Sequence, residues 1–135
     1  MADKTANTAR EDKSPLKCTP VETKLSIHSF SRELVDKVVH FQVLKMSGSL
    51  YFWIGTSASL SNLCVAMQTK YEDMPATSCL LGTIADVTSS TLAQKLAKRT
   101  KKQIFVSYNL QMDTSYMSLV EKAVIDEMQN VPDMF

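Results

Sequence analysis

Apolar and polar residues alternate over most of the chain after residue 24, with the two-residue period that is typical of β-strands. The predicted strands cover residues 25–28, 39–44, 50–54, 63–68, 75–81 and 104–110. The segment 30–38 fits either a strand or a short helical turn, because Phe30, Leu34 and Val38 also have helical spacing. Gly48 lies between two of the runs, which predicts a hairpin there.

The apolar period changes to that of a helix in two places. Leu92 and Leu96 fall on one helical face, and Ser89, Ser90 or Thr91 can cap the helix that carries them. The predicted helices run from about 89 to 101 and from about 115 to 129. Five strands, a helix, a strand and a helix predict an α+β fold, with an antiparallel sheet of about six strands and two helices on one face.

The first 22 residues differ in composition from the rest. They are polar, contain two prolines and have hardly any aliphatic side chains. Such a segment cannot bury enough apolar area to offset the entropy of ordering, so residues 1–22 are predicted to be a disordered tail. Residues 23–135 are predicted to form a single domain, since a domain typically has about 100–150 residues.

No charged side chain occurs from Met46 to Thr69, or again from Met74 to Ala85. A membrane span needs about 20 mainly apolar residues. Serine, threonine and asparagine interrupt the uncharged stretch, so no span is expected. Strands buried on both faces have continuous apolar runs, and residues 50–54 are such a run. The two helices can cover only one face, so a second layer is expected on the other.

Two arrangements would supply that layer. The chain could close its own sheet into a barrel or an internal sandwich, or a partner protein could bring a second sheet. Six short strands make a thin sandwich by themselves, which favours the partner and leaves the second face of the sheet available for it.

The charge balance and the cysteines narrow the class of protein. The chain has 15 basic and 14 acidic residues, a net charge of +1. Such a chain has no strong field for polyanions, so neither a nucleic acid nor a membrane is an expected partner. Three cysteines without metal or disulfide spacing, and the absence of a hydrophobic leader, predict a cytoplasmic protein, with the nucleus as the alternative.

The residues that usually carry catalysis are sparse. His28 and His40 are the only histidines, each lies in a strand pattern, and a structural role is the better interpretation of both. The chain contains no hydrolase elbow, zinc motif or calcium loop, and its three glycines are too far apart for a phosphate-binding loop. We therefore expect no catalytic residue, no metal and no cofactor, and we do not expect an enzyme.

Charge is divided between the two helical segments. Residues 87–112 hold five basic residues and no acid, whereas residues 113–135 hold five acidic residues and one lysine. Solvated helix faces that neutralise each other are the first interpretation, a basic patch for a partner protein is the second, and RNA binding is the third.

Several segments resemble the proteasome assembly chaperone four family. They are VHF at 39–41, LYFWIG at 50–55, NLCVAM at 62–67, LLG at 80–82, LAQKLAKRT at 92–100 and VSYNL at 106–110. The resemblance runs from about Leu25 to the C-terminus with the order of the elements intact. Some other assembly chaperones end in a hydrophobic residue, a tyrosine and any third residue. This chain ends in Asp133-Met134-Phe135, so the resemblance does not imply that it docks through its C-terminus.

The resemblance implies a heterodimer with proteasome assembly chaperone three, in which two sheets pack face to face. It also implies that the pair binds proteasome α subunits, promotes correct α-ring formation and is then released. A homodimeric adaptor of the same fold with another cargo is the alternative. The candidate anchors for the sister chaperone are the apolar residues Phe52, Trp53, Val65 and Met67. The candidate contacts for an α subunit are the basic residues Lys95, Lys98 and Arg99.

Overall fold

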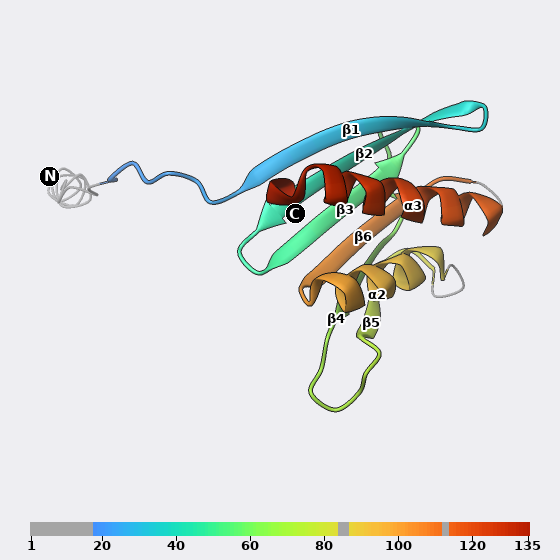
Figure 1. Ribbon diagram of the computed structural model, residues 1–135. Coiled ribbons are helices and arrows are strands. Elements are labelled where there is room, and N and C mark those ends of the chain that lie inside the picture. Colours follow the sequence, from blue (N-terminus) through green and yellow to red (C-terminus); the bar gives the residue numbers. More distant parts are fainter. Residues whose placement is uncertain (1–17, 84–86, 112–113) are drawn as a thin grey trace, which may run out of the picture.

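A computed structural model describes residues 18–83, 87–111 and 114–135. Six strands form one sheet in the order β1-β2-β3-β6-β4-β5 (Figure 1). The strands are β1 (Ser26–Leu34), β2 (Lys37–Met46), β3 (Ser49–Gly55), β4 (Leu63–Met67), β5 (Ala76–Leu81) and β6 (Gln103–Asn109). The helices are α2 (Thr88–Thr100), α3 (Thr114–Asn130) and the short 3-10 helix η1 (Pro132–Met134). The α+β fold and the order of its elements are as predicted.

The sheet is mixed, which corrects the prediction of an antiparallel sheet. Strands β1, β2 and β3 form an antiparallel meander, and β4 pairs antiparallel with both β5 and β6. Strand β6 pairs in parallel with β3. The reason is topological, because the chain makes β4, β5 and α2 before it returns to fill the place between β3 and β4, and parallel neighbours need such a crossover.

Two hairpin turns set the register of the meander. Gly48 has a φ of 79°, a left-handed conformation that suits glycine, and it joins β2 to β3 as predicted. The segment 30–38 is extended and not helical. Its turn consists of Val35 and Asp36 between β1 and β2, and Val35 has a φ of 62°, which is unusual for a β-branched residue.

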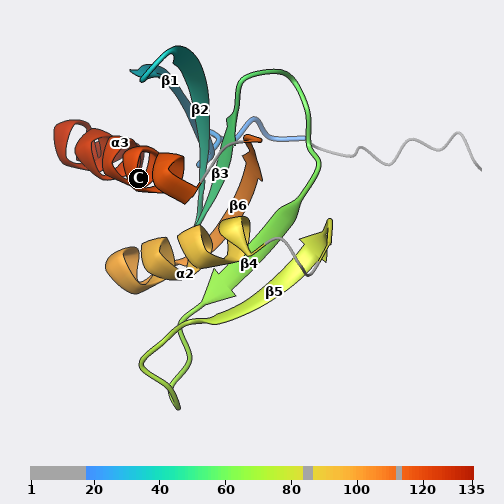
Figure 2. The same ribbon diagram turned by 90° about the vertical axis from the view of Figure 1, so that its right-hand side faces the viewer.

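Helices α2 and α3 lie on the same side of the sheet, and none of the described helices lies on the opposite side (Figure 2). Helix α2 packs on β4, β5 and β6, and α3 contacts β1. We call the two sides of the sheet the helix face and the open face. The core fills the space between the helices and the helix face. Its largest fully buried side chains are Val39, Phe41, Val43, Leu50, Phe52, Ile54, Leu92, Leu96, Ile104, Val106, Val120 and Val124.

The start of α2 differs from the predicted cap. Val87 occupies the N-cap position without a side-chain cap bond, and the hydroxyl of Ser90 donates to the Val87 carbonyl at 2.9 Å. Ser89 is buried and donates to the side chain of Asn62. The polar residue at this position therefore ties the helix to the sheet and does not cap it.

Most of the predicted tail, residues 1–17, lies outside the described residues, so that prediction stays a prediction. None of the helices in the described ranges is both long enough and apolar enough to cross a membrane.

Candidate protein-binding surface

An apolar row crosses the open face. The pairing register places Ile27, Leu44 and Tyr51 side by side on β1, β2 and β3. It continues through Phe105 on β6 to Val65 on β4. Because side chains alternate between the two faces of a strand, these five residues share the face opposite the buried core. We call this set the apolar row.

The apolar row is incompletely covered. Ile27 is 67% exposed, and the four residues Leu44, Tyr51, Phe105 and Val65 are half-buried. Among the strand positions that point to the open face in the described residues, Glu33 is the only one that carries a formal charge. A broad neutral face of this kind is typical of a surface that binds another protein.

The structure divides the four candidate anchors between the two faces. Trp53 and Val65 are half-buried on the open face, and Met67 is 51% exposed at the end of β4. Phe52 is only 1% exposed and stacks against Phe135 under the helices. This placement corrects the expectation for Phe52, since a side chain inside the chain's own core cannot contact a partner directly.

Sequence reasoning did not select the rest of the apolar row. Phe105 has a buried residue on either side of it along β6, and Leu44 has the buried Val43 beside it along β2; that alternation was the available signal for these two positions. The sequence alone does not say which of the two alternating sets the helices cover, so the row could not be chosen.

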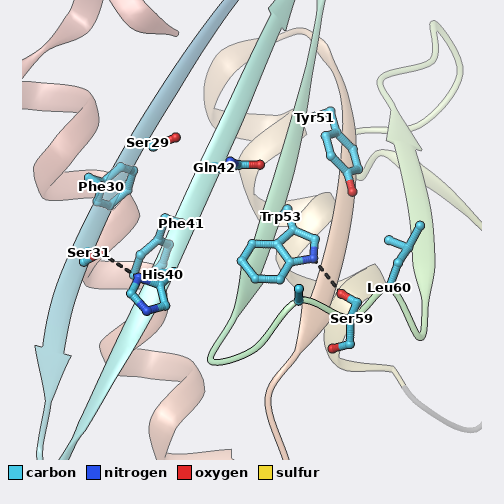
Figure 3. A pocket seen from close by; sticks show the side chains of 11 residues that line it. Ser29, Phe30, Ser31, His40, Phe41, Gln42, Tyr51, Trp53, Ser59 and Leu60 are labelled. Atoms are coloured by element: carbon cyan, nitrogen blue, oxygen red, sulfur yellow. Dashed lines mark hydrogen bonds between the residues drawn. The ribbon is translucent and has the colours of Figure 1, made fainter.

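A hollow of about 560 Å³ opens on this face beside the apolar row. It lies between the strands β1 to β3 and residues 58–60 of the loop that follows β3 (Figure 3). The side chains that line it include Ser29, Ser31, His40, Gln42, Trp53 and Leu60. The volume lies within the range of about 300–1,000 Å³ that is common for ligand pockets.

Hydrogen bonds hold two walls of the hollow. The indole N–H of Trp53 donates to the carbonyl oxygen of Ser59 at 2.7 Å. Ser31 Oγ and His40 Nδ1 are hydrogen-bonded at 2.8 Å (Figure 3). Burial raises the pKa of Tyr51, and a hydrogen bond with Ser107 opposes that rise, so the phenol is neutral at physiological pH.

His28 lies on the other side of the sheet, in a polar cluster around the buried carboxylate of Glu127. Its Nε2 is 2.9 Å from Glu127 Oε1, and Arg32 donates to the other carboxylate oxygen of Glu127. Burial on its own raises the pKa of Glu127, but the hydrogen bonds from His28 and Arg32 outweigh it and lower the pKa. The cluster joins β1 to α3, and His40 has its own partner in Ser31, so both histidines have the structural contacts that their pattern predicts.

The three candidate basic contacts lie on α2, away from the open face. Lys95 donates to Glu121 of α3 at 3.0 Å, as expected for two helices of opposite charge. Lys98 and Arg99 are exposed in the last turn of α2, where cations are favourable. Lys98 Nζ lies 3.7 Å from the sulfur of Met74 in the loop between β4 and β5. Lys98 and Arg99 thus remain available at the surface.

Within residues 18–83, 87–111 and 114–135, no group of three or more His, Cys, Asp and Glu side chains gathers closely enough to hold a metal ion. Cys18 is exposed, Cys64 is buried and Cys79 is intermediate, and none of the three forms a disulfide bond.

Comparison with known proteins relates this architecture to one family. The family model for proteasome assembly chaperone 4 matches residues 38–110, the segment from β2 to the end of β6. Proteasome assembly chaperone 4 of Homo sapiens is 45% identical over 112 residues, covering 82% of this chain and 91% of the human protein. The chain belongs to the proteasome assembly chaperone 4 family. The family protein of Mus musculus is 42% identical over 115 residues, covering 84% of this chain and 94% of its own length.

A solved structure shares the fold of this family member. It is described as the crystal structure of a novel chaperone complex for yeast 20S proteasome assembly, and its matching chain is 14% identical with a TM-score of 0.57. The match covers 77% of this chain and 96% of the yeast chain. At this level of identity the likeness concerns the fold alone.

Proposed function

We propose that the protein is a chaperone of proteasome core-particle assembly that acts by binding and not by catalysis. It forms a heterodimer with proteasome assembly chaperone three through the open face. The pair binds α subunits, promotes correct α-ring formation and leaves before the core particle is complete. The observation that carries this proposal is the apolar row on the sheet face opposite the two described helices α2 and α3.

The open face suits a second sheet better than a helix or a flexible peptide. The apolar row runs across five neighbouring strands, from Ile27 on β1 to Val65 on β4. Two packed sheets bury side chains along such rows in a layer about 10 Å thick. Trp53 and Tyr51 lie near the middle of the strand order and are the large aromatic residues that commonly dominate an interface.

Contact with an α subunit is proposed for the outer surface of α2. Lys98 and Arg99 are exposed there, and the sheet separates them from the open face, so both partners can bind at once. Charge complementarity affects the rate of encounter and the choice of partner more than affinity. A contact of this kind is consistent with release after the ring has formed.

Co-expression with assembly chaperone three, followed by size-exclusion chromatography, tests the heterodimer. The variant Val65→Asp buries a charge at the interface and should abolish co-elution. The matched variant Ser118→Asp, at an exposed position of α3, should leave it intact. If both variants co-elute equally well with assembly chaperone three, the open face is not the interface. If the natural chain does not co-elute with it, the proposal of a heterodimer is wrong.

A homodimeric adaptor of the same fold is the second candidate function, because an apolar face also allows two copies to pair. The elution volume and mass of the isolated chain separate the cases. A tight homodimer that does not exchange subunits with assembly chaperone three would favour the adaptor. Affinity purification from cells should recover α subunits under our proposal, with the protein in the cytoplasm and the nucleus.

A further inference from the structure

The hollow on the open face has a definite local cause. In the register of the sheet, Ser31 of β1 pairs with His40 of β2, which pairs with Gly55 of β3. His40 therefore has a small residue beside it on each neighbouring strand. The absence of a side chain at Gly55 also lets the Trp53 ring lie over the backbone, because a Cβ there would come within 2.8 Å of the indole. The hollow lies at this row, and the next row of the same face, Ser29, Gln42 and Trp53, lies between it and the apolar row.

The far wall of the hollow is fixed before any partner binds. Trp53 holds the loop through the carbonyl oxygen of Ser59. Two residues later, the backbone N–H and the hydroxyl of Ser61 donate to Asn109 Oδ1 at 2.8 and 2.9 Å. The next residue, Asn62, binds the backbone of Tyr108. A wall held at successive points loses little conformational entropy when a partner binds, which is what a preformed site requires.

The lining has two chemical sides (Figure 3). Tyr51, Trp53 and Leu60 provide an apolar side, and Gln42 with the Ser31 and His40 pair provides groups that can donate or accept a hydrogen bond. Among the described residues, no Lys, Arg, Asp or Glu lines the hollow. The matching occupant is therefore neutral, flat and apolar, with one hydrogen-bonding end.

We propose that the hollow is a socket for an aromatic side chain with a polar tip, a tyrosine or tryptophan, which the facing sheet of the sister chaperone presents. The inference rests on the proposed function, because it names the contact that gives the open face its specificity. Tyrosine and tryptophan have the required combination of an apolar body and a hydrogen-bonding end, and both are enriched at interfaces. Filling a preformed socket fixes the register of two sheets that would otherwise slide over each other along their apolar rows.

The chain supplies its own reporter for the test, because Trp53 is its only tryptophan. Benzyl alcohol is a probe with a neutral aromatic ring and a hydroxyl tip, and benzoate is the charged control of similar shape. Benzyl alcohol should change the Trp53 fluorescence saturably, and benzoate should bind at least several-fold more weakly. Ser31→Phe fills the socket and should abolish the response, whereas Ser118→Phe on α3 should keep it.

The same variants then test the occupant. Ser31→Phe should weaken pairing with assembly chaperone three at least about 10-fold, a difference of about 1.4 kcal/mol. Ser118→Phe should leave pairing unchanged. Leu60→Ala removes one wall without adding bulk and should weaken pairing too, which keeps the test valid if Ser31→Phe does not fold.

The outcomes are distinguishable. If the natural chain pairs and both socket variants pair equally well, the socket inference is overturned and the heterodimer stands. A response to benzyl alcohol in that case would mean that the hollow takes a free small molecule. If the natural chain does not pair at all, the proposed function fails together with the assigned occupant. Equal binding of benzoate and benzyl alcohol would contradict the neutral chemistry inferred for the lining.

Discussion

The indole N–H of Trp53 donates a hydrogen bond of 2.7 Å to the carbonyl oxygen of Ser59, six residues further along the chain. This bond folds the loop after β3 back over the open face. It depends on Gly55 between the two residues, since a side chain there would collide with the ring. One aromatic residue thus forms part of the exposed surface and also shapes the loop beside it.

Trp53→Phe separates these two roles. The phenyl ring keeps an aromatic surface but cannot donate the hydrogen bond to Ser59. The carbonyl oxygen of Ser59 is exposed and can bind water instead, so we expect the free energy of unfolding to fall by less than about 1 kcal/mol. Pairing with the sister chaperone should weaken several-fold, because the loop is no longer held. Chemical denaturation and a titration by calorimetry measure the two effects, and a large loss of stability would contradict the separation.

The two faces of the sheet should respond differently to truncation. Phe52→Ala removes a fully buried ring on the helix face and should cost about 3–5 kcal/mol of stability in the isolated chain. Val65→Ala trims a half-buried side chain on the open face, so it should cost at most about 1 kcal/mol in the isolated chain. In the heterodimer the cost of Val65→Ala should increase. Melting curves of each variant, alone and with the partner, test the assignment of the two faces. If Val65→Ala lowered the melting temperature of the isolated chain more than Phe52→Ala does, the assignment would be wrong.

Local pattern was sufficient for the elements and insufficient for their arrangement. Every predicted strand and helix exists, because alternation and helical spacing are properties of neighbouring residues. The parallel pairing of β6 with β3 was missed, since no local signal says that a strand will return to the middle of the sheet. Alternation along β3 places Tyr51 and Trp53 on the face opposite Phe52. Which set would meet the helices depends on where α2 and α3 pack, and that is a long-range property.

The hollow had no signal in the sequence for a related reason. Gly55 and Trp53 are close in the chain, but Ser31 comes from another strand and Asn109 from a third. Only the register of the sheet brings these small and polar residues together. The prediction that the two oppositely charged helices neutralise each other is confirmed for one pair, because Lys95 and Glu121 form a salt bridge between them.

Asn62 should be an important residue for stability although it lies outside the regular strands. Its side-chain amide binds both backbone groups of Tyr108, donating at 2.6 Å and accepting at 2.9 Å, and it also accepts from Ser89. It therefore takes the place of a strand partner for the end of β6. Asn62→Ala leaves buried polar groups without these bonds and should lower stability by about 2–3 kcal/mol.

The matched control for this variant is Asn130→Ala, because Asn130 is exposed at the end of α3. It should change stability by less than about 0.5 kcal/mol. Urea denaturation of both variants measures the difference. Equal midpoints would show that water replaces the bonds of Asn62 at no cost, contrary to its burial.

The cluster of the buried Glu127 with the partly exposed His28 and Arg32 should give the fold a characteristic dependence on pH. The pKa of Glu127 is lowered in the folded chain, because its hydrogen bonds with His28 and Arg32 outweigh the effect of burial. In the unfolded chain a glutamate titrates at about 4.3. A group with a lowered folded pKa stabilises the fold fully above its unfolded pKa, and that contribution is lost as the pH falls through the folded pKa.

Glu127→Gln tests this linkage, because it keeps the shape of the side chain and removes the charge. At pH 7 we expect a loss of about 1–3 kcal/mol, since Arg32 keeps a hydrogen-bonding partner but loses its counter-charge. The difference from the natural chain should begin to shrink as the pH falls below about 4.3, where the carboxylate of the unfolded chain takes up a proton, and it should vanish once the folded carboxylate is also neutral. Glu121→Gln is the control, because its pair with the half-exposed Lys95 should contribute at most about 1 kcal/mol. Urea denaturation at a series of pH values measures both variants, and a deficit for Glu127→Gln that stays constant down to pH values of about 3 would mean that the carboxylate charge does not stabilise the fold.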